Sequence, residues 1–106
     1  MIRLTDLQQQ QQYLVHRYRT GDTVITEVWQ AGDGKDDTWD CIYRYHQYDN
    51  GAGFASPPSN FPSRKHGLHQ LLTHVNIVPP SANGAVLEAS FISKEDAVQI
   101  MVEQAM

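Results

Sequence analysis

The sequence predicts a small α+β domain, in which an antiparallel sheet of three to five strands carries a C-terminal helix packed on one face. Two β-rich segments joined by a glycine-containing turn at 20–22 predict a hairpin. A third β-rich segment at 38–47 extends the hairpin into a meander. The chain closes with a capping serine and helically spaced apolar residues. Its 106 residues suit a single domain spanning 1–106.

The first two strands are expected at 13–19 and 23–30, because both segments are rich in β-branched and aromatic residues. Side-chain alternation groups Leu14, His16 and Tyr18 on one face of the first strand, and Ile25, Glu27 and Trp29 on one face of the second. The preceding residues 1–12, with a glutamine run, form a frayed arm or a short helix over roughly 5–11. Residues 31–37 (AGDGKDD) predict a solvated turn.

The third strand, 38–47, has an aromatic face and a polar face. Strict alternation puts Trp39, Cys41, Tyr43 and Tyr45 on the core side, and Thr38, Asp40, Ile42, Arg44 and His46 on the other. Cys41 is then expected to be a packed thiol.

The second half of the chain is less regular. Residues 49–65 have turn composition throughout and predict a long loop tethered by Phe54 and Phe61. A short helical turn over 68–73 is expected to run into a strand or extended segment that ends at Pro79. Residues 85–92 predict a short strand or an extended connection. Ser93 is the expected N-cap of the last helix.

The net charge, the cysteine count and the lack of long apolar segments argue against several classes of protein. A net charge of −4 and a pI of about 5.6 give no overall basic character for nucleic acid or a membrane surface, although a local basic site stays compatible. One cysteine cannot form a disulfide within the chain. No segment has the length of an apolar signal or membrane span, so we expect a cytoplasmic protein with no membrane partner.

Candidate chemistry concentrates in residues 41–69, which hold three of the five histidines. The expected catalytic residues are Arg44, His46, Lys65 and His66, and the expected substrate-binding residues are Tyr45, Tyr48 and Asp49. Metal-free RNA cleavage needs a base near pKa 7, an acid and a cation, which histidine, arginine and lysine supply. Arginine can hold phosphate in two hydrogen bonds, and a tyrosine can stack on a base. No cofactor is expected.

Two alternatives stay open for these residues. Arg44 is also suited to a cross-strand ion pair with Asp40 or Glu27. A metal site could instead be built from His66 and His69 with His74 and Asp49.

The order of motifs resembles the TumE-type toxin family of bacterial toxin–antitoxin modules. The matching segments are Tyr43-Arg44-Tyr45-His46, Tyr48-Asp49-Asn50-Gly51 and Phe61-Pro62-Ser63-Arg64-Lys65-His66, with paired strands before them and a closing helix. The resemblance covers about two-thirds of the chain. It implies a toxin, neutralised by an antitoxin protein, that acts as a nuclease or another translation inhibitor. The expected function is therefore a toxin acting on RNA. The alternative is a non-enzymatic interaction or regulatory module, whose open edge strand favours a partner chain or a homodimer.

Overall fold

The computed structural model describes residues 12–32, 38–77 and 85–105, and it confirms the predicted α+β class. Its antiparallel sheet has strands β1 (Tyr13–Thr20), β2 (Thr23–Ala31), β3 (Thr38–Tyr48), β4 (Gly53–Ala55), β5 (Lys65–His66) and β6 (Ala85–Ile92). The three predicted β-rich segments are β1, β2 and β3, with ends within one residue of expectation. The predicted N-terminal arm and the turn at 33–37 lie outside the described residues.

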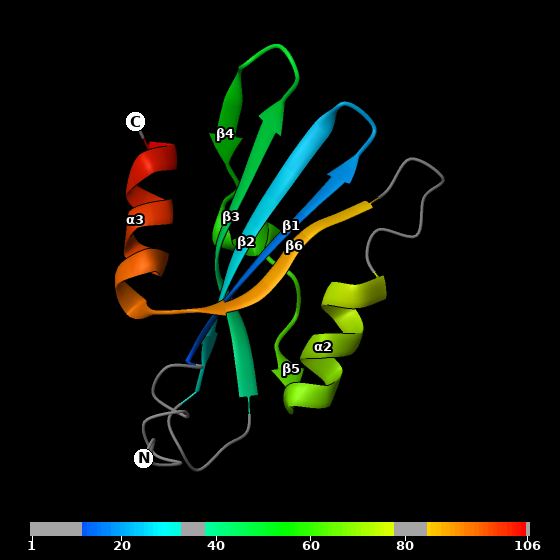
Figure 1. Cartoon of the computed structure of the whole chain (residues 1–106), viewed down its shortest axis with the longest axis vertical. Coiled ribbons are helices and arrows are strands. Elements are labelled where there is room, and N and C mark those ends of the chain that lie inside the picture. Colours follow the sequence, from blue (N-terminus) through cyan, green and yellow to red (C-terminus); the bar gives the residue numbers. More distant parts are fainter. Residues whose placement is uncertain (1–11, 33–37, 78–84, 106) are drawn as a thin grey trace.

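The sheet is ordered β4-β3-β2-β1-β6, with β5 beside the beginning of β3 (Figure 1). The predicted meander of β1, β2 and β3 is confirmed, and β4 continues it by a hairpin. The predicted strand or connection at 85–92 is a strand, β6, which pairs with β1. The sheet has six strands because two short segments of the proline-rich stretch join it.

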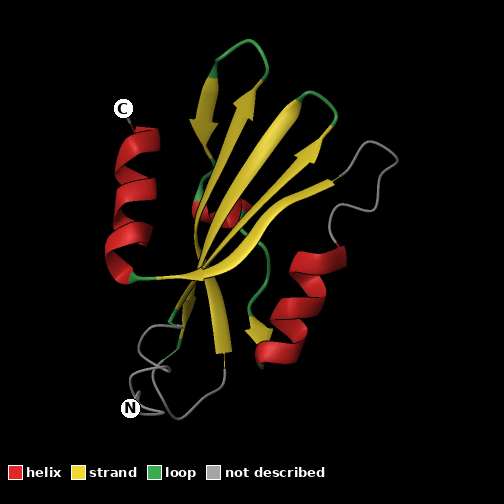
Figure 2. Ribbon diagram, in the orientation of Figure 1, coloured by secondary structure: helices red, strands yellow, loops and turns green. Residues whose placement is uncertain are grey.

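Two helices cover opposite faces of this sheet (Figure 2). On one face, Leu71 and Val75 of α2 (Leu68–Ile77) pack with Leu14, Trp29, Trp39 and Cys41. On the other face, Ala97 of α3 (Lys94–Ala105) packs with Tyr13 and Val28. We call these the α2 face and the α3 face. The predicted packing of the C-terminal helix is confirmed.

A β-bulge in β3 changes the predicted alternation. Cys41 pairs with Trp29, but Tyr43 pairs with Val28, so Ile42 is the extra residue. Ile42 and Tyr43 both pack near the α3 face core. Arg44 and every second residue after it therefore move to the α2 face, the side of Trp39 and Cys41. The expected separation of Arg44 from that aromatic face was wrong, because alternation assumes an unbroken strand.

The stretch 49–77 also differs from expectation. The predicted loop 49–65 contains β4, a 3₁₀ turn (Pro58–Asn60) and β5. The predicted break near residue 73 was wrong, because α2 is helical from Leu68 to Ile77. Leu71 and Val75 are four residues apart and share its buried side, and this contact with the sheet favours helix over strand. Neither described helix combines the length and apolar character needed to cross a membrane.

The predicted cap of the last helix is confirmed. The Asp96 backbone N–H donates to the Ser93 hydroxyl at 3.1 Å, and Glu95 and Asp96 occupy the first turn of α3. Replacing Ser93 by alanine is expected to lower the free energy of unfolding by about 1 kcal/mol, because that N–H loses its partner. Chemical denaturation measures this change, and Ser93→Asp, which also caps, should stay within a few tenths of wild type. Equal losses in both variants would contradict a capping role.

Candidate functional site

A row of polar residues crosses the three central strands on the α2 face. His16 of β1 pairs directly with Glu27 of β2, and Glu27 pairs directly with Arg44 of β3. Apolar residues fill the next row, where Leu14 and Cys41 flank Trp29. The polar row is therefore set inside a hydrophobic surface, and the bulge at Ile42 is what brings Arg44 into it.

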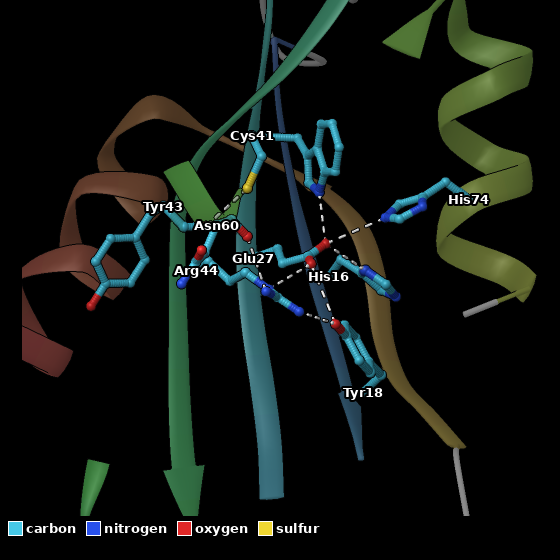
Figure 3. Close-up of polar contacts among 9 residues, drawn as sticks. His16, Tyr18, Glu27, Cys41, Tyr43, Arg44, Asn60 and His74 are labelled. Atoms are coloured by element: carbon cyan, nitrogen blue, oxygen red, sulfur yellow. Dashed lines mark hydrogen bonds and ion pairs between the residues drawn. The ribbon is translucent and has the colours of Figure 1, made fainter. Parts of the chain in front are cut away.

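The Glu27 carboxylate is the centre of this row (Figure 3). Its side chain is only 1% exposed. Oε1 accepts hydrogen bonds from His16 Nδ1 and Trp29 Nε1, both at 3.1 Å. Oε2 accepts a hydrogen bond from the Tyr18 hydroxyl at 3.4 Å and lies 3.4 Å from Arg44 Nε. A buried carboxylate is tolerated only with such partners, because an unpaired buried charge costs several kcal/mol.

Helix α2 adds a second histidine to the carboxylate. His74 Nε2 lies 3.6 Å from Glu27 Oε1, and the His74 ring meets the Trp29 ring edge-on. Its Nε2 is buried without a hydrogen-bond partner, as is the Nε2 of His16. The His74 side chain is 16% exposed, whereas His16 is fully buried. His74 is thus the more exposed of the two histidines around Glu27. We call His16, Tyr18, Glu27, Arg44 and His74 the Glu27 cluster.

The cluster controls the charge of Glu27. Burial by itself would raise the pKa of this carboxyl, but the hydrogen bond from His16, the contact with His74 and the hydrogen bond from Trp29 lower the pKa to about 2. Glu27 is therefore ionised at neutral pH. Burial, with the nearby negative charge of Glu27, raises the pKa of Cys41 to about 12. Cys41 is the packed, inert thiol that its position predicted.

Arg44 is fixed in place from three sides. Its Nε faces Glu27. One terminal nitrogen donates a hydrogen bond to the Asn60 carbonyl, and the other donates to the Tyr18 hydroxyl, each at 3.1 Å. The cross-strand pairing with Glu27 that the sequence left open is confirmed. A guanidinium has five N–H groups. Each terminal nitrogen thus keeps one N–H that no described contact uses, and the side chain is 22% exposed. Arg44 can offer both to an anion.

An aromatic surface extends from Arg44 along the same face toward the β3–β4 turn. His46 lies two residues beyond Arg44, and its ring stacks on Phe54 at 4.8 Å with an angle of 4°. Tyr48 comes next on this face of β3, and its ring centroid lies 6.1 Å from the ring centroid of Phe54. Phe54 and Tyr48 are exposed. Burial and the charge of Arg44 lower the pKa of His46, so it is neutral at pH 7.

The other two predicted binding residues have structural partners. Tyr45 lies on the α3 face, where it stacks with Tyr43 at 6.4 Å and covers Gly53 of β4. Asp49 accepts hydrogen bonds from Arg19 at 3.0 and 3.3 Å, which ties the two hairpin turns together.

The structure does not bring Lys65 and His66 to Arg44. Lys65 pairs with Trp39 and His66 with Thr38, at the beginning of β3. Arg44 is five residues further along this strand, roughly 15 Å away at strand spacing. The predicted group of four therefore separates into Arg44 with His46, and Lys65 with His66 at the opposite end.

Glu27 and His16 were not among the candidate site residues from the sequence, and His74 was a candidate only in a different metal set. A signal for the first two was present, because a glutamate and a histidine stand in the middle of otherwise apolar strand faces. A buried polar group is more informative than a buried apolar one. The pairing of β1 with β2 then sets them side by side. His74 carries no such signal, since only the packing of α2 places it there.

A metal ion could be held by His16, Glu27 and His74. Their ligand atoms all lie within 4.8 Å of one another. Among the described residues, these three are the group of histidine and carboxylate side chains that is close enough to share an ion. The set expected from the sequence is different, because it joined His74 to His66, His69 and Asp49. Asp49 is bonded to Arg19, and His66 and His69 are exposed.

Comparison with known proteins gives no relative from which a role could be transferred. The chain matches no protein-family model, and neither a curated protein nor a solved structure is significantly similar to it.

Proposed function

We propose that this protein binds RNA along the α2 face of β3 and β4 and cleaves it there, as the toxin component of a toxin–antitoxin module. The observation that supports RNA as substrate is the row Arg44, His46, Phe54 and Tyr48, which sets a fixed cation, a histidine and two exposed aromatic rings on one surface. Single-stranded RNA presents phosphates and unstacked bases that match these groups. The resemblance of residues 43–66 to TumE-type toxins supports the biological role.

The chemistry follows from Arg44, a member of the Glu27 cluster, and from His46, two residues further along β3. Arg44 donates its two remaining N–H groups to a phosphate, where they stabilise the charge that develops on the phosphorane. His46 is neutral at pH 7 because of its lowered pKa, so it can accept the proton of a 2′-hydroxyl. The 2′-oxygen then attacks the phosphorus, the bond from phosphorus to the 5′-oxygen breaks, and the leaving 5′-oxygen takes a proton from solvent water. Phe54 and Tyr48 stack on the adjoining bases. The net charge of −4 gives no long-range attraction, so binding depends on this local surface.

Replacing Phe54 by alanine is expected to weaken binding of a short single-stranded RNA by roughly tenfold, because a stacked base contributes about 1–3 kcal/mol. Fluorescence anisotropy with a labelled oligonucleotide measures this change. The matched control is Val102→Ala, which removes an equally exposed apolar side chain from α3 on the opposite face. RNA binding that is absent from wild type, or equal in wild type and Phe54→Ala, would exclude this surface.

Replacing His46 by alanine is expected to lower the rate of RNA cleavage by at least about 100-fold, which is the usual contribution of a general base. Growth arrest on expression in a bacterium should be lost with it. His69→Ala, an exposed histidine on α2, is the control and should keep both activities. Arrest that persists unchanged in His46→Ala would remove this histidine from the mechanism.

The second candidate is a protein-interaction module, and other exposed residues favour it. Val86 and Leu87 of β6 and Val98 and Val102 of α3 are exposed apolar residues. No described strand pairs with the outer edge of β6. These exposed apolar residues and the open edge of β6 suit an antitoxin or a second copy of the chain. If docking alone were the function, Leu87→Ala and Val102→Ala would abolish activity while Phe54→Ala and His46→Ala would keep it.

A further inference from the structure

The Glu27 cluster contains a donor set that a transition-metal ion prefers. We infer that His16, Glu27 and His74 bind one divalent ion of the zinc class, through His16 Nδ1, Glu27 Oε1 and His74 Nε2. Two imidazoles and one carboxylate are the protein ligands of catalytic zinc sites, which keep a further position open.

The distances between the ligand atoms fit such an ion. With bonds of about 2.0–2.2 Å, the ligands of a tetrahedral ion lie about 3.3–3.6 Å apart. Glu27 Oε1 lies 3.1 Å from His16 Nδ1 and 3.6 Å from His74 Nε2. The three atoms lie within 4.8 Å of one another. A small movement of His74, which reaches the sheet from α2, completes the geometry.

The hydrogen bonding around Glu27 points the same way. Three nitrogen atoms, from Trp29, His16 and His74, crowd around Oε1, which has two lone pairs. An ion bound between the histidines replaces their two contacts and leaves the Trp29 N–H as the second partner of Oε1. It also supplies a ligand bond to His74 Nε2, which is buried and has no hydrogen-bond partner in the described structure. An unpartnered buried nitrogen is costly, so the ion relieves that cost.

The rest of the cluster would act as support for the ion. Tyr18 and Arg44 hold Oε2, and contacts of this kind orient a carboxylate ligand. The net charge of the site also determines which kind of ligand the open coordination position of the ion would take. Glu27 and Arg44 cancel, so a divalent ion with neutral histidines leaves a net charge of about +2 in a buried site. The open position should therefore take an anion, either hydroxide or a phosphate oxygen.

This inference is independent of RNA as the substrate. Metal binding by the cluster can be measured without any nucleic acid, whereas the Phe54 comparison can be made on metal-free protein. A failure to bind metal would not affect the RNA-binding result, and a failure to bind RNA would not affect the metal-binding result.

The test uses the full chain, freed of metal and titrated with zinc chloride by calorimetry. Wild type should bind one ion per chain, and the same should hold for His69→Ala. His74→Ala should bind at least about 100-fold more weakly, since a directly bound ligand contributes more than its supporting partners do. Titration with cobalt(II) should give the visible absorption of a tetrahedral ion in wild type, and His74→Ala should lose it.

Thermal unfolding keeps the test valid if a variant folds poorly. One equivalent of zinc should raise the midpoint temperature of unfolding of wild type and of His69→Ala, because the ion binds only the folded chain. Glu27→Gln keeps the shape of the side chain and removes its charge, so zinc should not raise its midpoint. The inference is overturned by wild type that binds no stoichiometric ion, or by His74→Ala that binds as tightly as wild type.

Discussion

Replacing Glu27 by alanine is expected to lower the free energy of unfolding of the metal-free protein by about 3–5 kcal/mol. The carboxylate is buried and is the shared acceptor for His16, Tyr18 and Trp29, with Arg44 beside it. Its removal leaves those donors without an acceptor and leaves the Arg44 charge uncompensated. A domain of this size has about 5–15 kcal/mol in total, so the variant would be near its unfolding limit. Denaturation in urea measures the change.

Glu88→Ala is the matched control for this comparison. Glu88 also pairs with an arginine across two strands, since Arg17 donates to it at 2.9 Å. Both side chains of this pair are more than a third exposed, and such pairs contribute less than about 1 kcal/mol. Glu27→Ala should therefore cost several times more than Glu88→Ala. Similar losses would show that the Glu27 cluster contributes little to stability.

The local elements could be predicted because each is determined by nearby residues. The hairpin of β1 and β2 follows from two β-rich segments around Gly21, whose positive φ of 63° suits glycine. The last helix follows from Ser93 and the acids after it. These features depend on residues within one turn or one strand of each other, where sequence patterns are most informative.

The face of Arg44 could not be predicted because it depends on a single extra residue. Strict alternation holds only while a strand is unbroken, and the bulge at Ile42 reverses it for the rest of β3. Nothing in the sequence around Ile42 marks a bulge, since no glycine or proline occurs there. The consequence is large, because the bulge places Arg44 beside Glu27 and not on the α3 face.

The residues that make up the site could not be predicted from the sequence either, because they are brought together by contacts between elements that are distant along the chain. Lys65 and His66 were expected to share a site with His46, but their pairing with β3 places them at its other end. His74 is far from Glu27 in sequence and reaches it only because Leu71 and Val75 anchor α2 on the sheet. Only Arg44 connects the predicted site to the Glu27 cluster.

The stability of the metal-free protein is expected to fall by about 3 kcal/mol between about pH 6 and pH 2 through Glu27 alone. Its pKa is about 2 in the folded protein, against 4.5 as the ordinary value. The unfolded chain therefore takes up a proton on Glu27 at higher pH than the folded protein does. The stabilisation is complete above the ordinary pKa, and it is lost as the pH falls from about 4.5 toward 2.

Glu27→Gln isolates this contribution from that of the other carboxyl groups. Glutamine cannot ionise, and it resembles the protonated carboxyl in shape and charge. The free energies of unfolding of wild type and Glu27→Gln, measured in urea at a series of pH values, should differ most near neutrality and converge toward pH 2. Parallel curves would mean that Glu27 titrates alike in the folded and unfolded chains. In that case the hydrogen bonds from His16 and Trp29 would not stabilise its charge, and the Glu27 cluster would lack the electrostatic role assigned to it.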